Sequence, residues 1–483
     1  MEKGDFVEIY IEDMSQEGNG IGHADDGMTI FASGAAYGDR VRVGISNVKK
    51  NYATGKMVNI IEKSPFRKND EDVCPYIEKC GGCGYGKLVY EKQLELKEKS
   101  VKDKLERLGG IDFAKVKFNH IIPSPKQLHY RDKATIAVFN DMVGFKSPKS
   151  NFVVDCEECF IQNERANQAA NALREYIREE KLQGTFEKMV VRTTMNDENM
   201  VCLYTRPYIE KQNAAKAKNT KGKTYKKFDV NSIDIEKLAY GIDDAVENTL
   251  ESIWIDDKII AGKNTVLDRL GDLDFEISPL SFYQVNPEQM KNLYDKAFEY
   301  AGLKGNETVL DLYCGIGTIG LYFVEKMNRL ADENGLEHGM IYGIESVKPA
   351  IIDANRNAVI NHIVNARYFC GKAEDELPFM MGMKKLYKPN EVNEMVERVP
   401  EVTIDKVNVA VVDPPRAGCE KDLLDAVIKA EPERVVYISC DPGTLARDVK
   451  YLGENGYELK EATPCDMFPE TPHVECVVLL SRA

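Results

Sequence analysis

The stretch "TVLDLYCGIGTIGL", residues Thr308 to Leu321, decides the fold of the second half of the chain. It has the pattern of a short buried strand followed by a complete G-x-G-x-x-G, formed by Gly315, Gly317 and Gly320, that begins a helix. Glycines at this spacing let a backbone turn tightly and approach a ligand closely. The motif alone is weak, because it also occurs in dinucleotide enzymes and in loops that bind nothing. Its position between a strand and a helix predicts a cofactor loop.

The sequence around this loop alternates helices and strands from about residue 288. The expected strands are 308–313, 340–345, 407–413, 434–439 and 475–481. This alternation predicts an α/β domain with a doubly wound, Rossmann-like sheet over residues 281–483. Residues 381–404 fit none of its elements, so we expect a surface insertion there.

Two acids near the glycine loop indicate which cofactor it holds. Glu345 ends the next expected strand, where a carboxylate can accept both hydroxyls of a ribose. Asp311 precedes the glycines and would repel a pyrophosphate, whereas it suits a cationic sulfonium and an amino-acid ammonium. We therefore prefer S-adenosylmethionine to NAD.

A thiol and two further acids lie at the ends of other expected strands. In "RVVYISCDPGTLARD", Cys440 follows a strand directly; "VVDPPRAG" places Asp413 at a strand end, and Glu475 begins the last strand. Ligands of open α/β sheets bind beyond the carboxyl ends of the strands, so we expect Cys440 and Asp413 to face the crevice of the glycine loop. Helix capping by Asp413 and simple packing of Cys440 are the alternatives. Polar Ser439 and Asp441 beside the thiol argue against packing.

These groups suit methylation of uracil at C5, a carbon that is too weakly nucleophilic to attack a methyl sulfonium unaided. Addition of a thiolate at C6 makes an enolate whose C5 is nucleophilic, which is the role expected for Cys440. After methyl transfer the C5 proton must leave, and Glu475 is the candidate base. Asp413 can accept a hydrogen bond from N3–H of uracil, which cytosine lacks.

The first half of the chain has a different character. Residues 5–63 alternate β-prone runs with glycine-rich turns such as "EGNGIGHADDG", which predicts a small closed barrel. Between Arg40 and Lys68 there are eight basic residues and one acid, so we expect a basic barrel face. Residues 111–280 read as mixed strands and helices, interrupted by seven lysines in 211–227 that we interpret as a solvated loop.

An amphipathic helix and a group of cysteines lie between the barrel and the mixed region. Leu94, Val101, Leu105 and Leu108 should share one face of the helix, which Gly109 and Gly110 end. Before it, "CPYIEKCGGCGYG" spaces three cysteines as C-x5-C-x2-C, and "VVDCEECFIQ" adds two more. Three close cysteines and a distant fourth can ligate zinc or an iron–sulfur cluster, and the spacing does not choose between them.

Composition bounds the class of protein. The 483 residues carry a net charge of −15, and no apolar run approaches the length of a membrane span. The first residues lack the layout of a signal peptide, so we expect a cytoplasmic protein whose cysteines are ligands, a nucleophile or packing rather than disulfides.

Together these motifs resemble the TRAM-domain RNA (uracil-5-)-methyltransferases that act on bacterial 23S ribosomal RNA. The similarity covers nearly the whole chain and includes "SPLSFYQVNPEQ", "DLYCGIGTIGL", "VDPPRAG", "ISCDPGTLARD" and "DMFPETPHVE" in order. It implies a TRAM barrel over 1–62, a central α+β domain over 70–280 and the methyltransferase domain over 281–483. It further implies 23S ribosomal RNA as partner. We expect no membrane association, no obligate protein partner and a monomeric state.

The resemblance also implies roles for single residues. Cys440 is the nucleophile and Glu475 the base. Phe282, which could stack on an extruded uridine, Arg131 and Asp413 contact the substrate. The cofactor-side residues it implies are Gln284, Tyr313, Gly315, Gly317, Thr318, Glu345, Lys372 and Asp413. The ligands it implies for a [4Fe-4S] cluster are Cys74, Cys80, Cys83 and Cys159, with Cys159 preferred to Cys156 because it precedes "FIQ".

Three other functions compete with this reading. A transfer-RNA uracil-5-methyltransferase would share the catalytic motifs, and we expect the barrel and the four cysteines to favour ribosomal RNA. A non-catalytic RNA-binding protein would not need Cys440, Glu475 and the glycine loop together. An adenine-N6 methyltransferase would carry an aromatic residue where "DPPR" has Arg416.

Overall fold

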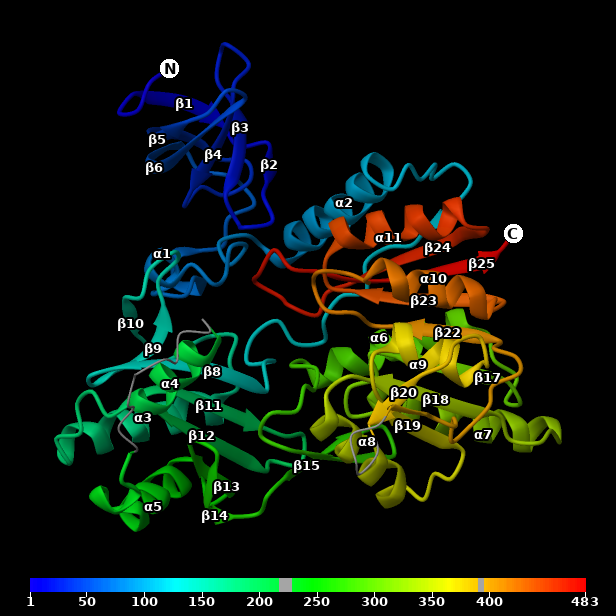
Figure 1. The fold of residues 1–483 in the computed structure, drawn as a ribbon. Helices are drawn as coiled ribbons and strands as arrows, with labels where there is room; N and C mark the ends of the chain where they lie inside the picture. The colour runs from blue at the N-terminus through cyan, green and yellow to red at the C-terminus, as the bar shows by residue number, and fades with distance from the viewer. Residues whose placement is uncertain (217–227, 390–394) are drawn as a thin grey trace. The chain divides into compact units, whose positions relative to one another are not determined.

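The computed structural model describes residues 1–216, 228–389 and 395–483, which fold into two compact units (Figure 1). The first unit comprises Met1–Leu96, Pro125–Val266 and Phe468–His473. The second comprises Lys97–Ser124, Leu267–Met467 and Val474–Ala483. Among the described residues, no helix is both long enough and apolar enough to cross a membrane.

The first unit begins with a six-stranded sheet in the order β1-β5-β6-β4-β3-β2. Its strands are β1 (Phe6–Tyr10), β2 (Asp13–Met14), β3 (Gly20–His23), β4 (Thr29–Ser33), β5 (Arg40–Val48) and β6 (Tyr52–Glu62). The sheet curls until β3 meets the end of β1, where Glu12 N–H donates to the Ile21 carbonyl at 2.9 Å. The run expected to be only a glycine-rich turn therefore contains a strand, β3. Gly22 is required there because a Cβ would lie 2.3 Å from the Tyr10 carbonyl oxygen.

The basic residues of this region divide into two groups. Arg67 forms a bidentate pair with buried Asp39, with nitrogen–oxygen distances of 2.8 and 2.6 Å, and Lys68 pairs with Glu470. Arg40, Arg42, Lys49, Lys50 and Lys56 are exposed. The Arg42 guanidinium lies 5.0 Å from the ring centroid of exposed Phe6. An exposed basic face thus exists on β5, β6 and the turn between them, but Arg67 and Lys68, which pair with buried acids, do not belong to it.

The cysteine-bearing segment follows the barrel. It contains a 3-10 turn (Asp70–Asp72) and the one-turn helix α1 (Ile77–Cys80). Gly81 then ends α1 with a φ of +65°, and a Cβ on it would lie 2.3 Å from Pro148. Helix α2 (Tyr90–Arg107) comes next and runs from the first unit's residues into the second's. Val101 and Leu105 are fully buried on it as predicted, but Leu108 lies beyond its end and is 56% exposed.

The rest of the first unit is a seven-stranded mixed sheet in the order β10-β9-β8-β11-β12-β13-β14. Its strands are β8 (Lys133–Phe139), β9 (Met142–Lys146), β10 (Val153–Asp155), β11 (Phe186–Thr193), β12 (Asn199–Thr205), β13 (Leu250–Ile255) and β14 (Lys258–Gly262). Helices α3 (Glu164–Glu179) and α5 (Ile235–Ala245) pack their apolar faces on this sheet. The mixed strands and helices expected here are present.

The lysine-rich segment is only partly a loop. Its first residues, 211–216, belong to helix α4 (Arg206–Lys216), which buries no side chain. The remainder, 217–227, lies outside the described residues.

The second unit contains an eight-stranded sheet in the order β19-β18-β17-β22-β23-β25-β24-β7. The strands are β7 (Lys117–Phe118), β17 (Thr308–Leu312), β18 (Met340–Glu345), β19 (Ala366–Cys370), β22 (Val409–Val412), β23 (Arg434–Ser439), β24 (Tyr457–Cys465) and β25 (Glu475–Arg482). The helices that connect or flank them are α6 (Pro287–Ala301), α7 (Thr318–Asn334), α8 (Lys348–Ile360), α9 (Ala373–Met380), α10 (Lys421–Ala430) and α11 (Pro442–Glu454). Strand β22, "VAVV", is buried throughout, as expected of a central parallel strand.

This sheet is mixed. The five strands from β19 to β23 are parallel, but β25 runs antiparallel to both β23 and β24. Strands β19 and β24 were not expected from the sequence. A separate pair, β15 (Val266–Leu270) and β16 (Leu273–Ile277), precedes the sheet, and the short hairpin β20 (Tyr387–Pro389) and β21 (Met395–Glu397) lies in the expected insertion. Residues 390–394 of that insertion lie outside the described residues.

Candidate active site

The glycine loop connects β17 to α7 with a backbone that requires its glycines. Gly315 and Gly317 have φ values of +54° and +82°, and a Cβ on Gly317 would lie 2.8 Å from the Tyr368 ring. Tyr313 also has a positive φ, +64°, although it carries a side chain. Such a backbone costs about 1–3 kcal/mol and concentrates at ligand sites. The loop thus has the open, strained form expected of a cofactor cradle.

Two acids flank this loop as the sequence predicted. Asp311 is 1% exposed, and its Oδ2 accepts the N–H of Gly320 at 2.9 Å. Its Oδ1 has no hydrogen-bond partner among the described residues, and burial raises its pKa to about 7. Glu345 follows in β18, where its Oε1 accepts the N–H of Val347 at 2.9 Å. A buried acid with an unused oxygen suits a ligand that brings its own positive charge, as S-adenosylmethionine does.

Strand register brings Cys440 and Glu475 to the same edge of the sheet. Ser439 of β23 pairs with Cys476 of antiparallel β25, so Cys440 and Glu475 are each the next residue beyond that pair. Asp413 follows β22, the parallel neighbour of β23. The three side chains therefore meet where β22 and β23 end and β25 begins.

The electrostatics of these groups agree with that proximity. Burial, followed by the charges of Glu475 and Asp413, raises the pKa of the Cys440 thiol to about 12. Burial and then Asp413 raise the pKa of Glu475 well above its ordinary value, whereas burial alone raises that of Asp413 to about 7. Glu475 is 3% exposed, and its Oε2 has no hydrogen-bond partner among the described residues. The Cys440 thiol therefore lies near two acids whose pKa values are also raised, so each of the three groups holds its proton more tightly than an exposed one would.

Two site residues escaped the sequence reasoning. Arg416 is exposed, and its positive charge lowers the pKa of both Cys440 and Glu475 against the effect of burial. Arg416 could have been found from the sequence, because it lies three residues after Asp413 in the same motif. Tyr294 of α6 is 1% exposed, and its hydroxyl lies 3.2 Å from the Thr318 hydroxyl. The contact of Tyr294 with Thr318 could not be predicted, because a single tyrosine within a helical pattern does not indicate its tertiary partner.

The remaining predicted residues are placed as follows. Phe282 is 63% exposed and Gln284 is buried, both in the segment before α6. That segment is held by buried Asp353 of α8, which accepts the Ser278 hydroxyl at 2.9 Å and the Ser281 hydroxyl at 2.6 Å. Thr318 begins α7, directly after the loop.

Lys372 and Arg131 have less distinctive surroundings. Lys372 precedes α9, and its ammonium lies 3.5 Å from Glu374 at the surface. Arg131 belongs to the first unit, where its Nε donates to the Lys133 carbonyl at 3.2 Å. Their roles stay predictions.

The predicted cluster ligands lie in the first unit. Burial raises the pKa of Cys83 well above its ordinary value, with smaller contributions from Cys159, Glu470, Cys74 and Cys80. Asn167 of α3 holds the backbone of Cys159, since it accepts the Cys159 N–H at 3.0 Å and donates to its carbonyl at 3.2 Å. The four thiols therefore influence one another. In the part of the chain that the structure describes, however, no three His, Cys, Asp or Glu side chains are arranged to hold a metal ion.

Residues 89–483 match the family described as tRNA (Uracil-5-)-methyltransferase, and residues 1–58 match the TRAM domain. The chain belongs to this methyltransferase family. An uncharacterized RNA methyltransferase of Caldanaerobacter subterraneus is 37% identical over 99% of this chain and 98% of its own length. One of Bacillus cereus is 35% identical over 100% of this chain and 98% of its own.

A solved structure resembles the chain over almost its whole length. The tRNA (uracil-54, C5)-methyltransferase of Pyrococcus abyssi, crystallised with S-adenosyl-L-homocysteine, superposes with a TM-score of 0.68 at 27% identity. The match covers 98% of this chain and 99% of that one. These matches confirm the predicted α/β methyltransferase fold with an N-terminal TRAM domain. They also confirm the prediction that the protein is an enzyme of the S-adenosylmethionine-dependent RNA uracil-5-methyltransferase family.

Proposed function

We propose that the protein methylates C5 of a uridine in RNA through a covalent bond between Cys440 and C6 of the base. The observation that carries this proposal is the register of β23 and β25, which brings a thiol and a buried carboxyl together beside a cofactor loop. A protein that only bound RNA would need none of these groups at one sheet edge.

Cys440 acts first, as the nucleophile. Its thiol gives its proton to solvent, and the thiolate sulfur bonds to C6, which moves the electrons of the C5–C6 double bond into an enolate. Because its pKa is raised to about 12, the thiol needs help to ionise, and the Arg416 charge favours the thiolate. When bound, S-adenosylmethionine supplies an electrophilic methyl group to C5.

Glu475 acts last, as the base. It takes the C5 proton, the electrons of that C–H bond restore the C5–C6 double bond, and the C6–sulfur bond breaks to release the Cys440 thiolate. Burial raises the pKa of Glu475, so its carboxylate, once ionised, is a stronger base than an exposed one, which suits this step. Asp413 selects uracil by accepting from its N3–H.

Features of the first unit support RNA as the substrate. Exposed Phe6 and Tyr10 of β1 lie opposite Gly44 and Arg40 of β5, so aromatic rings and cations share one face of the barrel. Cations contact phosphates, and exposed rings can stack on unpaired bases. We also assign to the substrate Arg131 of the first unit. In the second unit, we assign Phe282 to an extruded uridine.

For the class of RNA, we propose 23S ribosomal RNA, as the motif resemblance implies, with tRNA as the second candidate. The Pyrococcus abyssi enzyme favours the second, because it acts on tRNA and matches this chain over nearly its whole length. The barrel therefore does not by itself distinguish the two substrates.

We also propose that Cys74, Cys80, Cys83 and Cys159 hold a [4Fe-4S] cluster with a structural role. The proposal rests on the motif resemblance, and the four cysteines lie in one unit of the fold. Cys156 is a poorer ligand, because its thiol donates to the Glu158 carbonyl at 3.3 Å. Methyl transfer moves no net electrons, so no catalytic step uses the cluster.

The test is release of tritium from RNA that carries [5-³H]uridine, since methylation at C5 must expel that hydrogen. We expect S-adenosylmethionine-dependent release into water from unmodified 23S ribosomal RNA, followed by mapping of the 5-methyluridine. Release from tRNA alone would transfer the proposal to the second candidate. Methylation without tritium release would overturn C5 as the target.

A further inference from the structure

The residues that connect β24 to β25 deliver Glu475 to the site. The two strands form an antiparallel hairpin in which Cys465 pairs with Glu475, so residues 466–474 form its loop. Asp466, the first residue of this loop, directly follows Cys465, which is the strand partner of Glu475.

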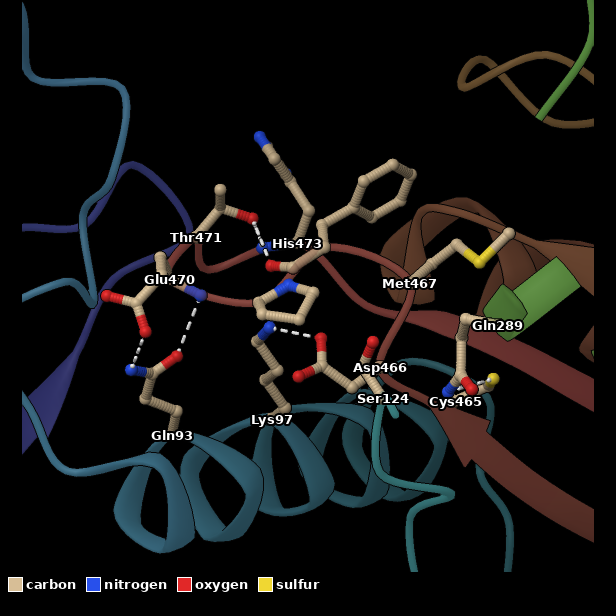
Figure 2. A network of polar contacts seen from close by, with 12 residues as sticks. Gln93, Lys97, Ser124, Gln289, Cys465, Asp466, Met467, Glu470, Thr471 and His473 are labelled. Carbon is tan, nitrogen blue, oxygen red and sulfur yellow. Dashed lines mark hydrogen bonds and ion pairs between the residues drawn. The ribbon is translucent and has the colours of Figure 1, made fainter. Parts of the chain in front are cut away.

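A buried ion pair holds the start of this loop. Lys97 of α2 lies 2.6 Å from Asp466, and both side chains are 0% exposed. Figure 2 shows the Lys97 ammonium reaching from the helix to the Asp466 carboxylate just beyond Cys465. The Asp466 N–H also donates to the Ile122 carbonyl at 2.9 Å.

Amides from α6 and its N-cap support the same stem of the hairpin. The Gln289 amide donates to the Cys465 sulfur at 3.1 Å and to the Ile122 carbonyl at 3.0 Å. The Asn286 amide donates to the Met467 carbonyl at 3.2 Å. Cys465, Asp466 and Met467 are thus each held by a named polar contact.

The tip of the loop, in the first unit, is held by the preceding turn of α2. Gln93 donates to the Glu470 carboxylate at 3.0 Å and accepts the Glu470 N–H at 2.9 Å. Lys68 lies 2.6 Å from the same carboxylate. Gln93 and Lys97 are four residues apart, so they lie on one face of the helix, which Figure 2 shows.

We propose that Lys97 and Asp466 are positioning residues that hold the loop 466–474, and through it Glu475, for removal of the C5 proton. The inference rests on the proposed function, in which Glu475 is the base. A buried ion pair is a poor device for stability alone, because desolvation of both charges offsets their attraction and apolar replacements are often as stable. Its directional bond does fix the position of the carboxylate.

The experiment separates position from stability. The double variant Lys97→Met/Asp466→Leu removes both charges at similar volume, so we expect it to keep the wild-type thermal midpoint. It is incubated with S-adenosylmethionine and the RNA that releases tritium with wild-type protein, and the covalent protein–RNA adduct is followed on denaturing gels. We expect the adduct to form normally and to decay about 10- to 100-fold more slowly, because small displacements of a catalytic group have effects of that size. Binding of S-adenosylmethionine should not change.

Two further variants keep the test decisive. Lys117→Met/Glu461→Leu removes the 3.0 Å ion pair between β7 and the other half of β24 and should leave adduct decay unchanged. Asp466→Asn replaces the carboxylate partner of Lys97 with a neutral amide and so weakens this contact. If the double variant does not fold, this single variant should show the slower decay. A folded Lys97 or Asp466 variant that clears its adduct at the wild-type rate overturns the inference. Glu475→Gln is run in parallel; if it accumulates no adduct, the proposed role of Glu475 fails instead.

Discussion

The edge of the methyltransferase sheet and the cysteine region of the first unit are built in different ways. Cys440, Asp413 and Glu475 lie at strand ends, so hydrogen-bonded register determines which of them meet. Cys74, Cys83 and Cys159 lie outside strands and helices, and Cys80 ends a single turn of helix. Strand pairing thus sets the relative positions of the first group of residues, whereas loops and a single helical turn position the second.

The largest effect expected is that of Cys440→Ala. Without the thiol, C6 is not attacked and C5 stays unreactive, so turnover should fall roughly 10⁴-fold or more. Binding of S-adenosylmethionine, measured by calorimetry, should be unchanged because its loop is intact. Cys370→Ala at the exposed end of β19 is the matched control. Substantial turnover by Cys440→Ala would remove the covalent step from the mechanism.

Glu475→Gln should stop the reaction later. The amide fills the same space but cannot take the C5 proton, so we expect elimination to slow roughly 10²- to 10⁴-fold and a methylated adduct to accumulate. A denaturing gel with radiolabelled RNA measures that adduct. Full turnover with no adduct would contradict the assignment of Glu475 as the base that removes the C5 proton.

Substitutions in the cysteine region should change the metal content of the protein rather than the steps of methyl transfer. Protein purified without oxygen should contain about four irons per chain, and Cys159→Ser should lose them while Cys156→Ser keeps them. Iron analysis and the visible absorption spectrum provide the measurement. The reverse pattern would show that Cys156, not Cys159, is the ligand. Stoichiometric zinc in colourless wild-type protein would show that the site binds zinc and not an iron–sulfur cluster.

The smallest effect expected concerns Asp311. Burial raises its pKa from 3.8 to about 7, so the folded protein holds a proton that the unfolded chain releases between about pH 4 and 7. The free energy of unfolding therefore falls as pH rises through this window and levels off above it. Asp311→Asn cannot ionise and should be roughly 1–3 kcal/mol more stable than wild type at pH 8, with no gain at pH 4.

Thermal midpoints across this pH range, without added cofactor, provide the measurement. Asp272→Asn, which changes an exposed carboxylate of the same unit, should show no such dependence. A midpoint difference between wild type and Asp311→Asn that is the same at both pH values would contradict the assigned proton.

The residues of the sheet edge could be proposed from the sequence because their signals are local. A strand followed by Gly315, Cys440 or Asp413 can be read from a dozen neighbouring residues. The antiparallel course of β25 could not be read in this way, because strand direction depends on the distant pairing of Cys476 with Ser439. Strand β24 was missed since its charged residues, such as Glu458 and Lys460, interrupt the apolar pattern.

Contacts between distant segments were also beyond the sequence. Lys97 reads as one charge among many in "EKQLELKEKS", yet it is fully buried against Asp466. Arg67 and Lys68 count as basic residues of the barrel until Asp39 and Glu470 are seen beside them. Local charge patterns give sign and number, but only tertiary packing shows which charges face water.

That division of charges has a consequence for the salt dependence of RNA binding. Four basic residues of the cluster are exposed and form no ion pair within the described part of the chain: Arg42, Lys49, Lys50 and Lys56. The other four each pair with an acid: Arg40, Lys63, Arg67 and Lys68. Counterions are released from RNA only by cations that replace them at phosphates, so a plot of log affinity against log salt should have a barrel contribution of roughly −3 to −4. Counting all eight cations would give a slope of roughly twice that size.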